Sequence, residues 1–346
     1  MSVFDAHDFD GHEQVTFCHD AASGLKAIIA IHNTNLGPAL GGCRYWAYAS
    51  EEEAIKDVLR LSRGMTYKAA LANLALGGGK AVIIGDPKVE KTPEKLRAFG
   101  RFVERLGGLY ITAEDVGTSP QDMSIIAEDT RYVVGRDDKE GGSGDPSIMT
   151  ALGVFAGIRA CVFYKLGKSN LAGVRVGVEG LGHVGLDLVR RLADAGAHLV
   201  VTDINKGLVH KAIHEYGAKA VKPDDIFGAD VDVFVPCALG GILNDHTIPQ
   251  LKAKIIAGSA NNQLAESYHA KVLEERGILY APDYLINAGG LINVTYEGPK
   301  YNAETVKDHV ESIYYTLLEI FETAKAYHMS TSDASDRLAR DIFNKK

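Results

Sequence analysis

Residues 174–185 read VRVGVEGLGHVG, an apolar run that leads directly into a Gly-x-Gly-x-x-Gly motif. The run predicts a buried strand, and the motif is expected to open a helix that continues through Leu192 to Gly196. A second apolar run, residues 198–203, follows the helix and ends in Asp203. A strand, a glycine turn, a helix and a strand in this order form the dinucleotide-binding unit of a Rossmann fold. The stretch therefore predicts an α/β domain of the Rossmann type.

The residues of this motif are the first candidates for a cofactor site. Its glycines permit a tight turn and close approach of a pyrophosphate, and the helix N-terminus favours negative charge. Asp203 lies 18 residues after Gly185, close to the spacing of a carboxylate that bonds the ribose hydroxyls. Because this carboxylate would repel a 2′-phosphate, we expect NAD rather than NADP. The positive charge of Lys206 nearby would slightly reduce that repulsion. The predicted cofactor-binding residues are Gly180, Leu181, Gly182, His183, Val184, Gly185, Asp203, Thr150 and Asn262, the last of which could equally form an asparagine turn.

Composition limits the remaining choices. A chain of 346 residues suggests two domains, and its 46% hydrophobic and 24% charged residues are ordinary for a soluble globular protein. The net charge of −8 offers no basic patch, so we expect neither nucleic acid nor a membrane surface as a partner. Four scattered cysteines and an N-terminus without signal-peptide features predict a cytoplasmic protein. The twelve histidines lack metal-ligand spacing, so no metal is expected.

A polar, glycine-rich stretch interrupts the chain at residues 136–146 and reads as a loop and candidate hinge. It separates an N-terminal domain, residues 1–135, from a Rossmann domain, residues 136–330. In the N-terminal domain strands and helices also alternate, which predicts a second α/β unit.

Lys80 is the main catalytic candidate in the N-terminal domain. It follows Gly77-Gly78-Gly79 and runs into the apolar strand 81–84, so it should be aimed into a space that the glycines leave open. Burial disfavours the charged form of a lysine, which makes it useful as an acid, a base or a nucleophile. A phosphate-binding P-loop is excluded, because Leu74 and Ala81 replace its first glycine and its Ser/Thr. The alternative is a glycine turn with a surface lysine.

Two further polar residues accompany Lys80. Ser50 is expected to cap a helix that ends near Gly64, and Lys68 follows it, where a lone lysine is usually a solvated cation. Asp115 follows the strand 110–113, where a carboxylate is often a cap or a turn former. Since Lys80 is expected to begin its strand and Asp115 to follow one, antiparallel neighbours would be needed to bring them together.

Taken together, these motifs resemble the glutamate/leucine/phenylalanine/valine dehydrogenase family, and within it the leucine dehydrogenases. The resemblance extends over nearly the whole chain and is carried by the Gly180 motif and by residues 36–44, 65–68, 77–80, 112–118, 260–263 and 287–290. Two departures are a short tail after Ser332, which bears on assembly, and His183, where leucine dehydrogenases commonly have asparagine.

The resemblance implies a role for each matching residue. Lys68 would hold the substrate carboxylate, Lys80 would be the catalytic lysine and Asp115 its partner in proton transfer, with Gly41 and Gly42 lining the site. The N-terminal domain would form a homo-oligomer and would face the NAD domain across a cleft, and a C-terminal helix, residues 331–346, would return to it.

The implied reaction is NAD-dependent, reversible oxidative deamination of leucine, valine and isoleucine to 2-oxo acids and ammonia. Two alternatives are a phenylalanine dehydrogenase and, from another class, a non-catalytic dinucleotide sensor, which would have no need of Lys68, Lys80 and Asp115 together. In glutamate-specific relatives the positions of Leu40 and Val294 hold a lysine and a serine that bind the distal carboxylate. The expected side-chain pocket is therefore aliphatic, formed by Leu40, Ala113, Leu291 and Val294.

Overall fold

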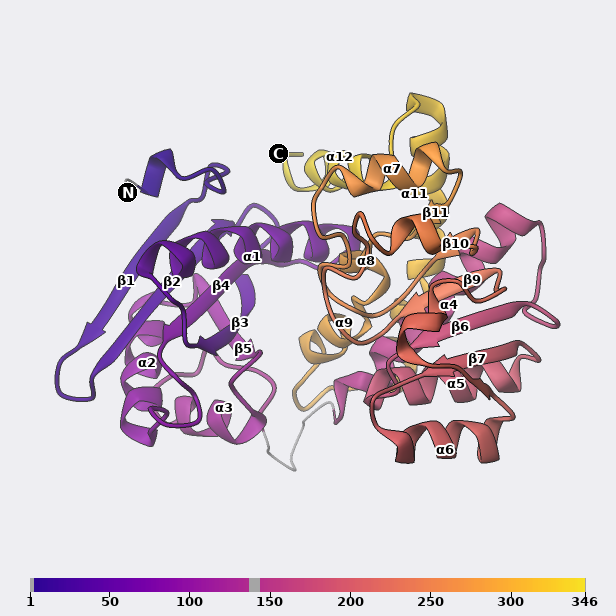
Figure 1. The fold of residues 1–346 in the computed structure, drawn as a ribbon. Coiled ribbons are helices and arrows are strands. Elements are labelled where there is room, and N and C mark those ends of the chain that lie inside the picture. Colours follow the sequence, from indigo (N-terminus) through magenta and orange to yellow (C-terminus); the bar gives the residue numbers. More distant parts are fainter. Residues whose placement is uncertain (1–2, 137–143, 346) are drawn as a thin grey trace. The chain divides into compact units, whose positions relative to one another are not determined.

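The computed structural model describes residues 3–136 and 144–345, and Figure 1 shows their fold. The chain divides into two compact units. Unit 1 comprises Met1–Gly144, Val294–Tyr301 and Ala339–Lys346, and unit 2 comprises Asp145–Asn293 and Asn302–Leu338. Residues 137–143 of the loop expected as a hinge lie outside the described residues.

Unit 1 is built on a mixed five-stranded sheet. Its order is β1-β2-β4-β3-β5, and the β1–β2 and β2–β4 pairs are antiparallel, whereas β3 is parallel to both β4 and β5. The strands are β1 Gln14–Asp20, β2 Leu25–Asn33, β3 Ala39–Trp46, β4 Gly77–Ile84 and β5 Tyr110–Glu114. Its 3-10 helix is η1 Val3–Asp5, and its first helices are α1 Glu51–Leu71, α2 Pro93–Arg105 and α3 Pro120–Ile126.

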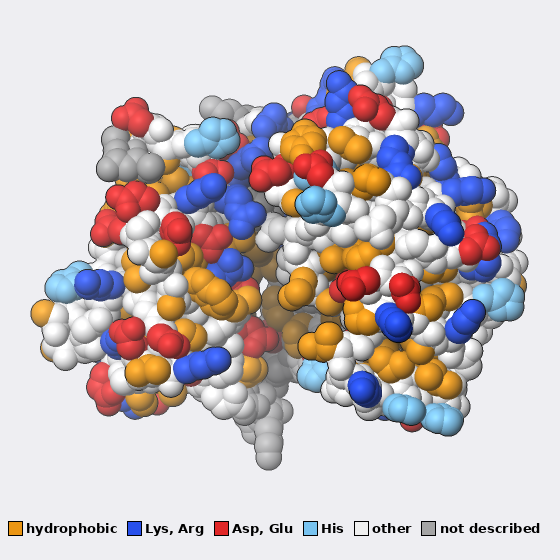
Figure 2. Space-filling model, viewed as in Figure 1, with side chains coloured by type: hydrophobic (Ala, Val, Ile, Leu, Met, Phe, Trp, Pro, Cys, Tyr) orange, Lys and Arg blue, Asp and Glu red, His pale blue; other side chains and the backbone are white. Residues whose placement is uncertain are grey.

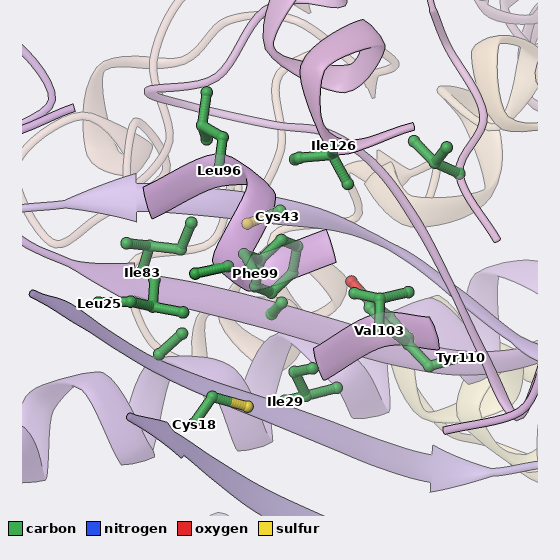
Figure 3. Packing of buried hydrophobic residues seen from close by; sticks show 14 of the residues in the cluster. Cys18, Leu25, Ile29, Cys43, Ile83, Leu96, Phe99, Val103, Tyr110 and Ile126 are labelled. Atoms are coloured by element: carbon green, nitrogen blue, oxygen red, sulfur yellow. The ribbon is translucent and has the colours of Figure 1, made fainter. Parts of the chain in front are cut away.

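Alternate residues of the strands pack against helices on opposite faces of this sheet, as strand geometry requires. Ile28 and Val82 face α1 and pack with Val58 and its neighbours. Ile29 and Ile83 face the other way, into a cluster with residues of α2 and α3, including Phe99 and Ile126 (Figure 3). The sheet is thus covered on both faces, and α1 packs on the face that carries the candidate site.

Helix α1 is longer than the sequence predicts. Ser50 caps it by accepting a hydrogen bond from the Glu53 amide, as expected. The expected end near Gly64 is wrong, because the helix continues to Leu71. A glycine inside a helix lowers stability by only about 0.5–1 kcal/mol, and the burial of Tyr67, Ala69 and Leu71 outweighs that loss. Lys68 therefore lies within the last turn of α1.

Unit 2 holds a six-stranded sheet of order β11-β10-β9-β6-β7-β8, in which every pair is parallel. Its strands are β6 Arg175–Glu179, β7 His198–Thr202, β8 Lys219–Ala220, β9 Val233–Pro236, β10 Ile255–Ile256 and β11 Leu279–Tyr280. The remaining helices are α4 Pro146–Leu166, α5 His183–Asp194, α6 Lys206–Tyr216, η2 Pro223–Ile226, η3 Ile248–Gln250, α7 His269–Glu275, α8 Asp283–Ile286, α9 Gly289–Thr295, α10 Ala303–Glu311, α11 Ile313–Tyr327 and α12 Thr331–Phe343. This sheet confirms the predicted Rossmann-type unit, and the two units confirm the predicted two-domain α/β fold.

Two features bear on the expected partners. Among the described residues, only α4 is long and apolar enough to cross a bilayer, and 61% of its apolar window is buried, as in the core helix of a globular unit. The face shown in Figure 2 carries acidic and basic side chains interspersed, without a continuous basic patch.

Two buried histidines, His12 and His32, contact α1 in unit 1. The rings of His12 and His32 meet edge to face at 4.9 Å. His12 Nε2 lies 3.0 Å from Leu59 O, and His32 Nδ1 lies 2.8 Å from Thr66 Oγ1 on the same helix. Burial lowers the pKa of His32 to about 4, assisted by His12 and opposed by the Asp10 carboxylate. Both rings are therefore built into the fold in the neutral form.

This burial predicts a pH-dependent stability. The unfolded chain binds a proton at His32 near pH 6.5 and the folded chain only near pH 4, so the contribution of His32 is complete above pH 6.5 and is lost as the pH falls towards 4. The full loss is on the order of 3 kcal/mol. In chemical denaturation at pH 7.5 and pH 5, His32→Asn should lose less stability on acidification than the wild type. The exposed His19 serves as the control, and a His32→Asn protein with the wild-type pH slope would contradict this.

Candidate active site

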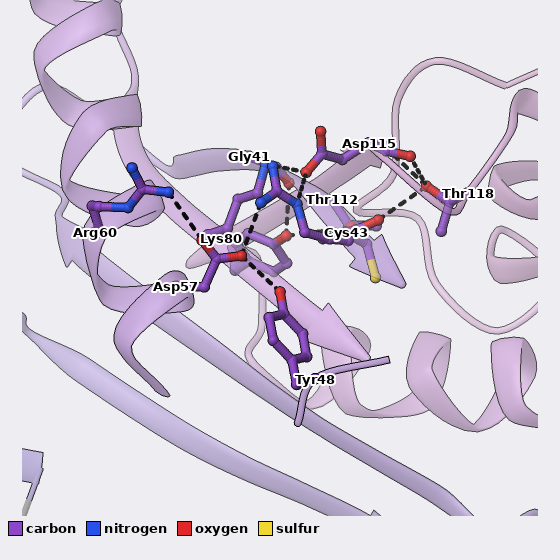
Figure 4. Close-up of polar contacts among 11 residues, drawn as sticks. Gly41, Cys43, Tyr48, Asp57, Arg60, Lys80, Thr112, Asp115 and Thr118 are labelled. Atoms are coloured by element: carbon purple, nitrogen blue, oxygen red, sulfur yellow. Dashed lines mark hydrogen bonds and ion pairs between the residues drawn. The ribbon is translucent and has the colours of Figure 1, made fainter. Parts of the chain in front are cut away.

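Lys80 and Asp115 form a buried ion pair in unit 1. Lys80 Nζ lies 2.8 Å from Asp115 Oδ2, and the Lys80 side chain is only 7% exposed (Figure 4). Lys80 projects from the middle of β4, and Asp115 directly follows β5. Removing each charge from water costs several kcal/mol of desolvation free energy, and the attraction between the two opposite charges offsets this cost.

The strand register explains how the two residues meet. The three glycines before Lys80 belong to β4 itself and do not form a turn, so Lys80 is the fourth residue of its strand. Strand β3 lies between β4 and β5, and its Cys43 is opposite both Ala81 and Glu114, the neighbours of Lys80 and Asp115. The expectation that antiparallel neighbours would be needed is therefore wrong. It placed the start of β4 three residues too late.

Gly42 permits the approach of Asp115. A Cβ at Gly42 would lie 2.5 Å from the Glu114 carbonyl oxygen and 2.8 Å from the Asp115 Cβ, closer than side chains pack. Asp115 is then fixed locally, because its amide donates to Thr118 Oγ1 at 2.9 Å. The Thr118 hydroxyl also lies 2.9 Å from the Cys43 carbonyl oxygen, which ties this turn to β3.

Lys68 lies on α1, the helix that packs on this face of the sheet. A Cβ at Gly78 would lie 2.0 Å from the Thr66 amide nitrogen, so the absence of a side chain lets the last turns of α1 rest on β4. Lys68 follows Thr66 by two residues and Lys80 follows Gly78 by two, and Lys68 is half-buried. The structure thus brings α1 and β4 together where the two lysines lie.

The carboxyl of Asp115 is held in its ionised form. Burial opposes ionisation, but the charges of Lys80 and Arg44 together hold the pKa of Asp115 below its usual value. Arg44 Nε lies 3.0 Å from the same oxygen that contacts Lys80. A carboxylate with a lysine as hydrogen-bonded partner can receive and return protons within a water-poor site.

The four predicted side-chain pocket residues are distributed over both units. Leu40 is buried on β3, and Ala113 is half-buried on β5, opposite Gly42. Leu291 is buried on α9 in unit 2, and Val294, half-buried on the same helix, groups with unit 1. Tyr110 donates to the carbonyl oxygen of Gly41 at 2.6 Å and so fixes the backbone beside Leu40.

The Gly180 loop of unit 2 has free donors for an anion. It links β6 to α5, whose N-cap is Gly182, and no side chain caps this helix. Its first amides are therefore available to a pyrophosphate. A hollow lined by Leu181, Gly182, His183 and Asp187 lies at this end of α5. The residues present therefore fit a dinucleotide.

Two carboxyl groups lie beneath that loop. Asp203 accepts hydrogen bonds from the Leu181 amide at 2.6 Å and from the Asn205 amide at 2.7 Å, which fixes it beside the loop. Glu179 ends β6, and its Oε2 is buried without a hydrogen-bond partner among the described residues. Burial raises the pKa of Glu179, an effect that the Ala238 amide opposes and the Asp203 charge reinforces.

The other cofactor candidates are less clearly placed. Thr150 lies on α4, where its hydroxyl donates to the Pro146 carbonyl oxygen at 3.0 Å. Asn262 is exposed and has a φ of +51°, so its backbone is left-handed. This is the conformation of an asparagine turn, the alternative to a cofactor-binding role. His183 is 86% exposed, and its Nδ1 lies 3.7 Å from Asp145. Within the described parts of the chain, no three His, Cys, Asp or Glu side chains gather as metal ligands would.

Sequence reasoning missed three residues beside the ion pair. Arg44 bridges Asp115 and Asp57, and Tyr48 donates to Asp57 at 2.7 Å. Arg44 lies two residues after Gly42 on β3 and therefore faces the same side of the sheet, which follows only once residues 39–46 are known to form a strand. Asp57 could not be found in this way, because its contact depends on where α1 rests on the sheet.

Comparisons with known proteins agree with this geometry. Residues 12–132 match the family model for the dimerisation domain of Glu/Leu/Phe/Val dehydrogenases, and residues 201–339 match the Glutamate/Leucine/Phenylalanine/Valine dehydrogenase model. The chain is 55% identical over 341 residues to a leucine dehydrogenase of Geobacillus stearothermophilus, covering 99% of this chain and 93% of that enzyme. The chain therefore belongs to the glutamate/leucine/phenylalanine/valine dehydrogenase family, as the sequence predicted.

Two further relatives act on aromatic amino acids according to their names. A phenylalanine dehydrogenase of Caldalkalibacillus thermarum is 48% identical over 351 residues, covering 100% of this chain and 95% of that enzyme. The crystal structure of L-tryptophan dehydrogenase from Nostoc punctiforme matches with a TM-score of 0.87 and 51% identity, over 96% of both chains. The protein is thus an amino-acid dehydrogenase, and membership of this family confirms NAD as the predicted cofactor.

The close approach at Gly42 gives a direct test of the site geometry. In Gly42→Ala the added methyl must displace the end of β5 and with it Asp115, and a displacement of about 1 Å lowers catalysis roughly a hundredfold. Gly64→Ala is the control, because a Cβ there meets nothing within 4 Å, and this change should leave turnover intact. Steady-state kinetics and thermal melts of both variants check the prediction, and a fully active Gly42→Ala protein would contradict it.

Proposed function

We propose that the protein catalyses the NAD-dependent, reversible oxidative deamination of branched-chain L-amino acids to 2-oxo acids and ammonia. The observation that carries the proposal is the buried Lys80–Asp115 pair on the sheet face that also holds Leu40 and Ala113. A proton-transferring pair beside aliphatic walls suits an amino acid whose side chain is uncharged.

The substrate's α-carboxylate is assigned to Lys68, the half-buried ammonium on the last turn of α1. Gly41 and Gly42 would line the site, where the absence of side chains lets the backbone of β4 and β5 approach closely. These contacts would direct the amino group of the substrate towards Lys80 and Asp115. Binding of a carboxylate by a partly desolvated lysine also compensates the charge of that lysine.

The proposed chemistry moves two protons through the ion pair. Bound NAD supplies the hydride acceptor for the α-carbon. The substrate ammonium would first release one proton to solvent, and loss of the hydride from the α-carbon would then leave an iminium. Lys80, after giving its proton to Asp115, would take a proton from the water that attacks the iminium carbon, which gives a carbinolamine. Asp115 would pass its proton to the carbinolamine nitrogen, take the hydroxyl proton as the C–N bond breaks, and give that proton to the departing ammonia. The pair in the structure is ionised, so the neutral lysine expected from the sequence would form only during turnover.

Asp203 is assigned as the residue that selects NAD. Its carboxylate is fixed by two backbone amides beside the Gly180 loop, where it would accept hydrogen bonds from the ribose hydroxyls. A 2′-phosphate at this position would face a fixed negative charge. The remaining loop residues, from Leu181 to Gly185, Thr150 and Asn262 would complete the cofactor site.

The aliphatic pocket is the basis of the branched-chain assignment. Each CH₂ buried there contributes about 0.8 kcal/mol, whereas an ionised side chain would be desolvated without a partner. The phenylalanine and tryptophan dehydrogenases among the relatives make an aromatic amino acid the second candidate. A non-catalytic sensor is disfavoured, because sensing a dinucleotide gives no reason to bury a lysine and a carboxylate in unit 1.

The protein is further proposed to be a cytoplasmic homo-oligomer. The dimerisation-domain match over residues 12–132 supports a homo-oligomer formed by the N-terminal domain, to which residues from Ala339 onward also belong. The four cysteines are unpaired, which supports a cytoplasmic location.

The role of Lys80 is tested by Lys80→Ala. This change should remove at least about 99% of turnover, because it removes one partner of the proton transfer. NAD affinity, measured by the quenching of protein fluorescence, should stay near the wild-type value. Lys95→Ala is the control, since Lys95 lies on α2, on the other face of the sheet, where it forms a 3.3 Å ion pair with Glu90. Substantial turnover in Lys80→Ala would mean that the catalytic lysine is misassigned.

The role of Asp203 is tested by Asp203→Ser. Removing the charge that would face a 2′-phosphate should raise the ratio of kcat/KM for NADP to that for NAD by about tenfold or more. The exposed Asp224 provides the control substitution within the same unit. A wild type that already prefers NADP would show that the assignment of Asp203 is wrong.

The pocket is tested by the substrate profile. Glutamate should be a very poor substrate, because its carboxylate would lose its hydration at a cost of several kcal/mol. Leucine, isoleucine and valine should differ less, since one methylene is worth about 1–3 kcal/mol. Initial rates of NADH formation give kcat/KM for each amino acid. Comparable values for glutamate and leucine would exclude the assignment, and a higher value for phenylalanine would favour the second candidate.

A further inference from the structure

Arg44 joins the ion pair to a second carboxylate. Its Nε lies 3.0 Å from Asp115 Oδ2, and its Nη1 lies 2.8 Å from Asp57 Oδ2. The side chain is only 20% exposed, and β3 places it between the candidate site and α1. An arginine in this position is a rigid connection, because a planar guanidinium fixes the directions of its hydrogen bonds.

Asp57 is itself held from the other side. Tyr48 donates to its Oδ2 at 2.7 Å, and Arg60 Nη2 lies 3.2 Å from its Oδ1 (Figure 4). Burial, reinforced by the Asp57 charge, raises the pKa of Tyr48, so this phenol remains a donor. The result is a line of contacts from α1 through Arg44 to Asp115.

Lys80 and Arg44 contact the same oxygen of Asp115 but differ as cations. Lys80 must lose its proton during the proposed reaction, whereas an arginine stays charged throughout. Burial opposes the charge, but the carboxylates of Asp115 and Asp57 hold the pKa of Arg44 above its usual value. A permanent positive charge therefore remains on Asp115 when Lys80 becomes neutral.

We propose that Arg44 is a positioning residue for this reaction, which holds the Asp115 carboxylate towards Lys80 and keeps a positive charge beside it while Lys80 cycles. Asp57 orients Arg44 from α1. The inference rests on the proposed function, since it gives Arg44 a role in the proton transfer between Lys80 and Asp115. A purely structural role, in which Arg44 only ties β3 to α1, is the competing explanation.

Few other groups can titrate beside Asp115. Burial raises the pKa of the Cys43 thiol on β3 and that of the Tyr110 phenol on β5, so both stay neutral in the working pH range. The charged groups beside Asp115 include Lys80 on β4, Arg44 on β3, the adjacent Glu114 on β5 and, through Arg44, Asp57 on α1, and the proposed site adds Lys68 on α1. A shift of the acid limb that appears in Arg44→Met and is absent in Arg44→Lys therefore reports the charge at position 44.

The test compares Arg44→Met, Arg44→Lys and Asp57→Asn with the wild type by the pH dependence of kcat/KM for leucine. Removing the charge in Arg44→Met should raise the acid limb by about one pH unit or more and lower the plateau at least tenfold. In Arg44→Lys the acid limb should stay at the wild-type pH, because the positive charge is kept. The plateau value of kcat/KM should be only partly retained, because a lysine cannot contact Asp115 and Asp57 as the guanidinium does. Asp57→Asn should lower the plateau without raising the limb.

Arg97→Met is the control, because Arg97 forms a 2.6 Å pair with Glu128 on the surface of the same unit and should change neither quantity. Thermal melts report folding. If Arg44→Met does not fold, Arg44→Lys and Asp57→Asn still decide between charge and position. An acid limb that stays in place in Arg44→Met while the melting temperature falls would overturn the proposal in favour of a structural tie.

A second readout separates this inference from the proposed function. The carboxyl resonance of Asp115, titrated by NMR, should move to higher pH in Arg44→Met whether or not leucine is the substrate. Absence of amino-acid oxidation by the wild type would refute the function while this titration still tests Arg44. An unchanged Asp115 titration would refute the role of Arg44 alone.

Discussion

The buried contact between Lys80 and Asp115 is the constraint on which the arrangement of unit 1 depends. Withdrawing either charge from water alone would cost several kcal/mol, so the pair requires a fold that brings the two side chains within 2.8 Å. The parallel β4, β3 and β5 strands provide this, and the small residues Gly42 and Gly78 let β5 and α1 approach closely. The close backbone packing at these glycines is therefore as necessary for the position of the ion pair as the two side chains are.

In unit 2 the candidate binding groups belong mainly to the backbone. The uncapped amides at the start of α5 can donate to an anion, and Asp203 is fixed by two amides beside them. None of this needs contacts between residues far apart in sequence, apart from the pairing of β6 with β7. A local motif of six residues can therefore indicate the candidate cofactor site, whereas the Lys80–Asp115 pair in unit 1 depends on the sheet.

The sequence predicted the Rossmann unit and the α/β class of both units, and it selected Lys80 and Asp115, which the structure brings into contact. It failed where tertiary packing overrides local signals. Gly64 looked like a helix end, yet burial of the following residues extends α1 to Leu71. The glycines before Lys80 looked like a turn, yet sheet pairing makes them part of β4. The contact from Arg44 to Asp57 depends on how α1 lies against β3, which no local pattern encodes.

The central claim is that Lys80 and Asp115 act as one proton-transferring unit, and a double-mutant cycle tests it most directly. The kcat of Lys80→Ala, Asp115→Ala and the double variant should be measured with leucine and NAD at the wild-type optimum pH. If the two residues form one unit, the double variant should lose no more than the worse single variant, because removal of either partner already abolishes the transfer. Losses that multiply in the double variant would show that the residues act independently and would contradict the account.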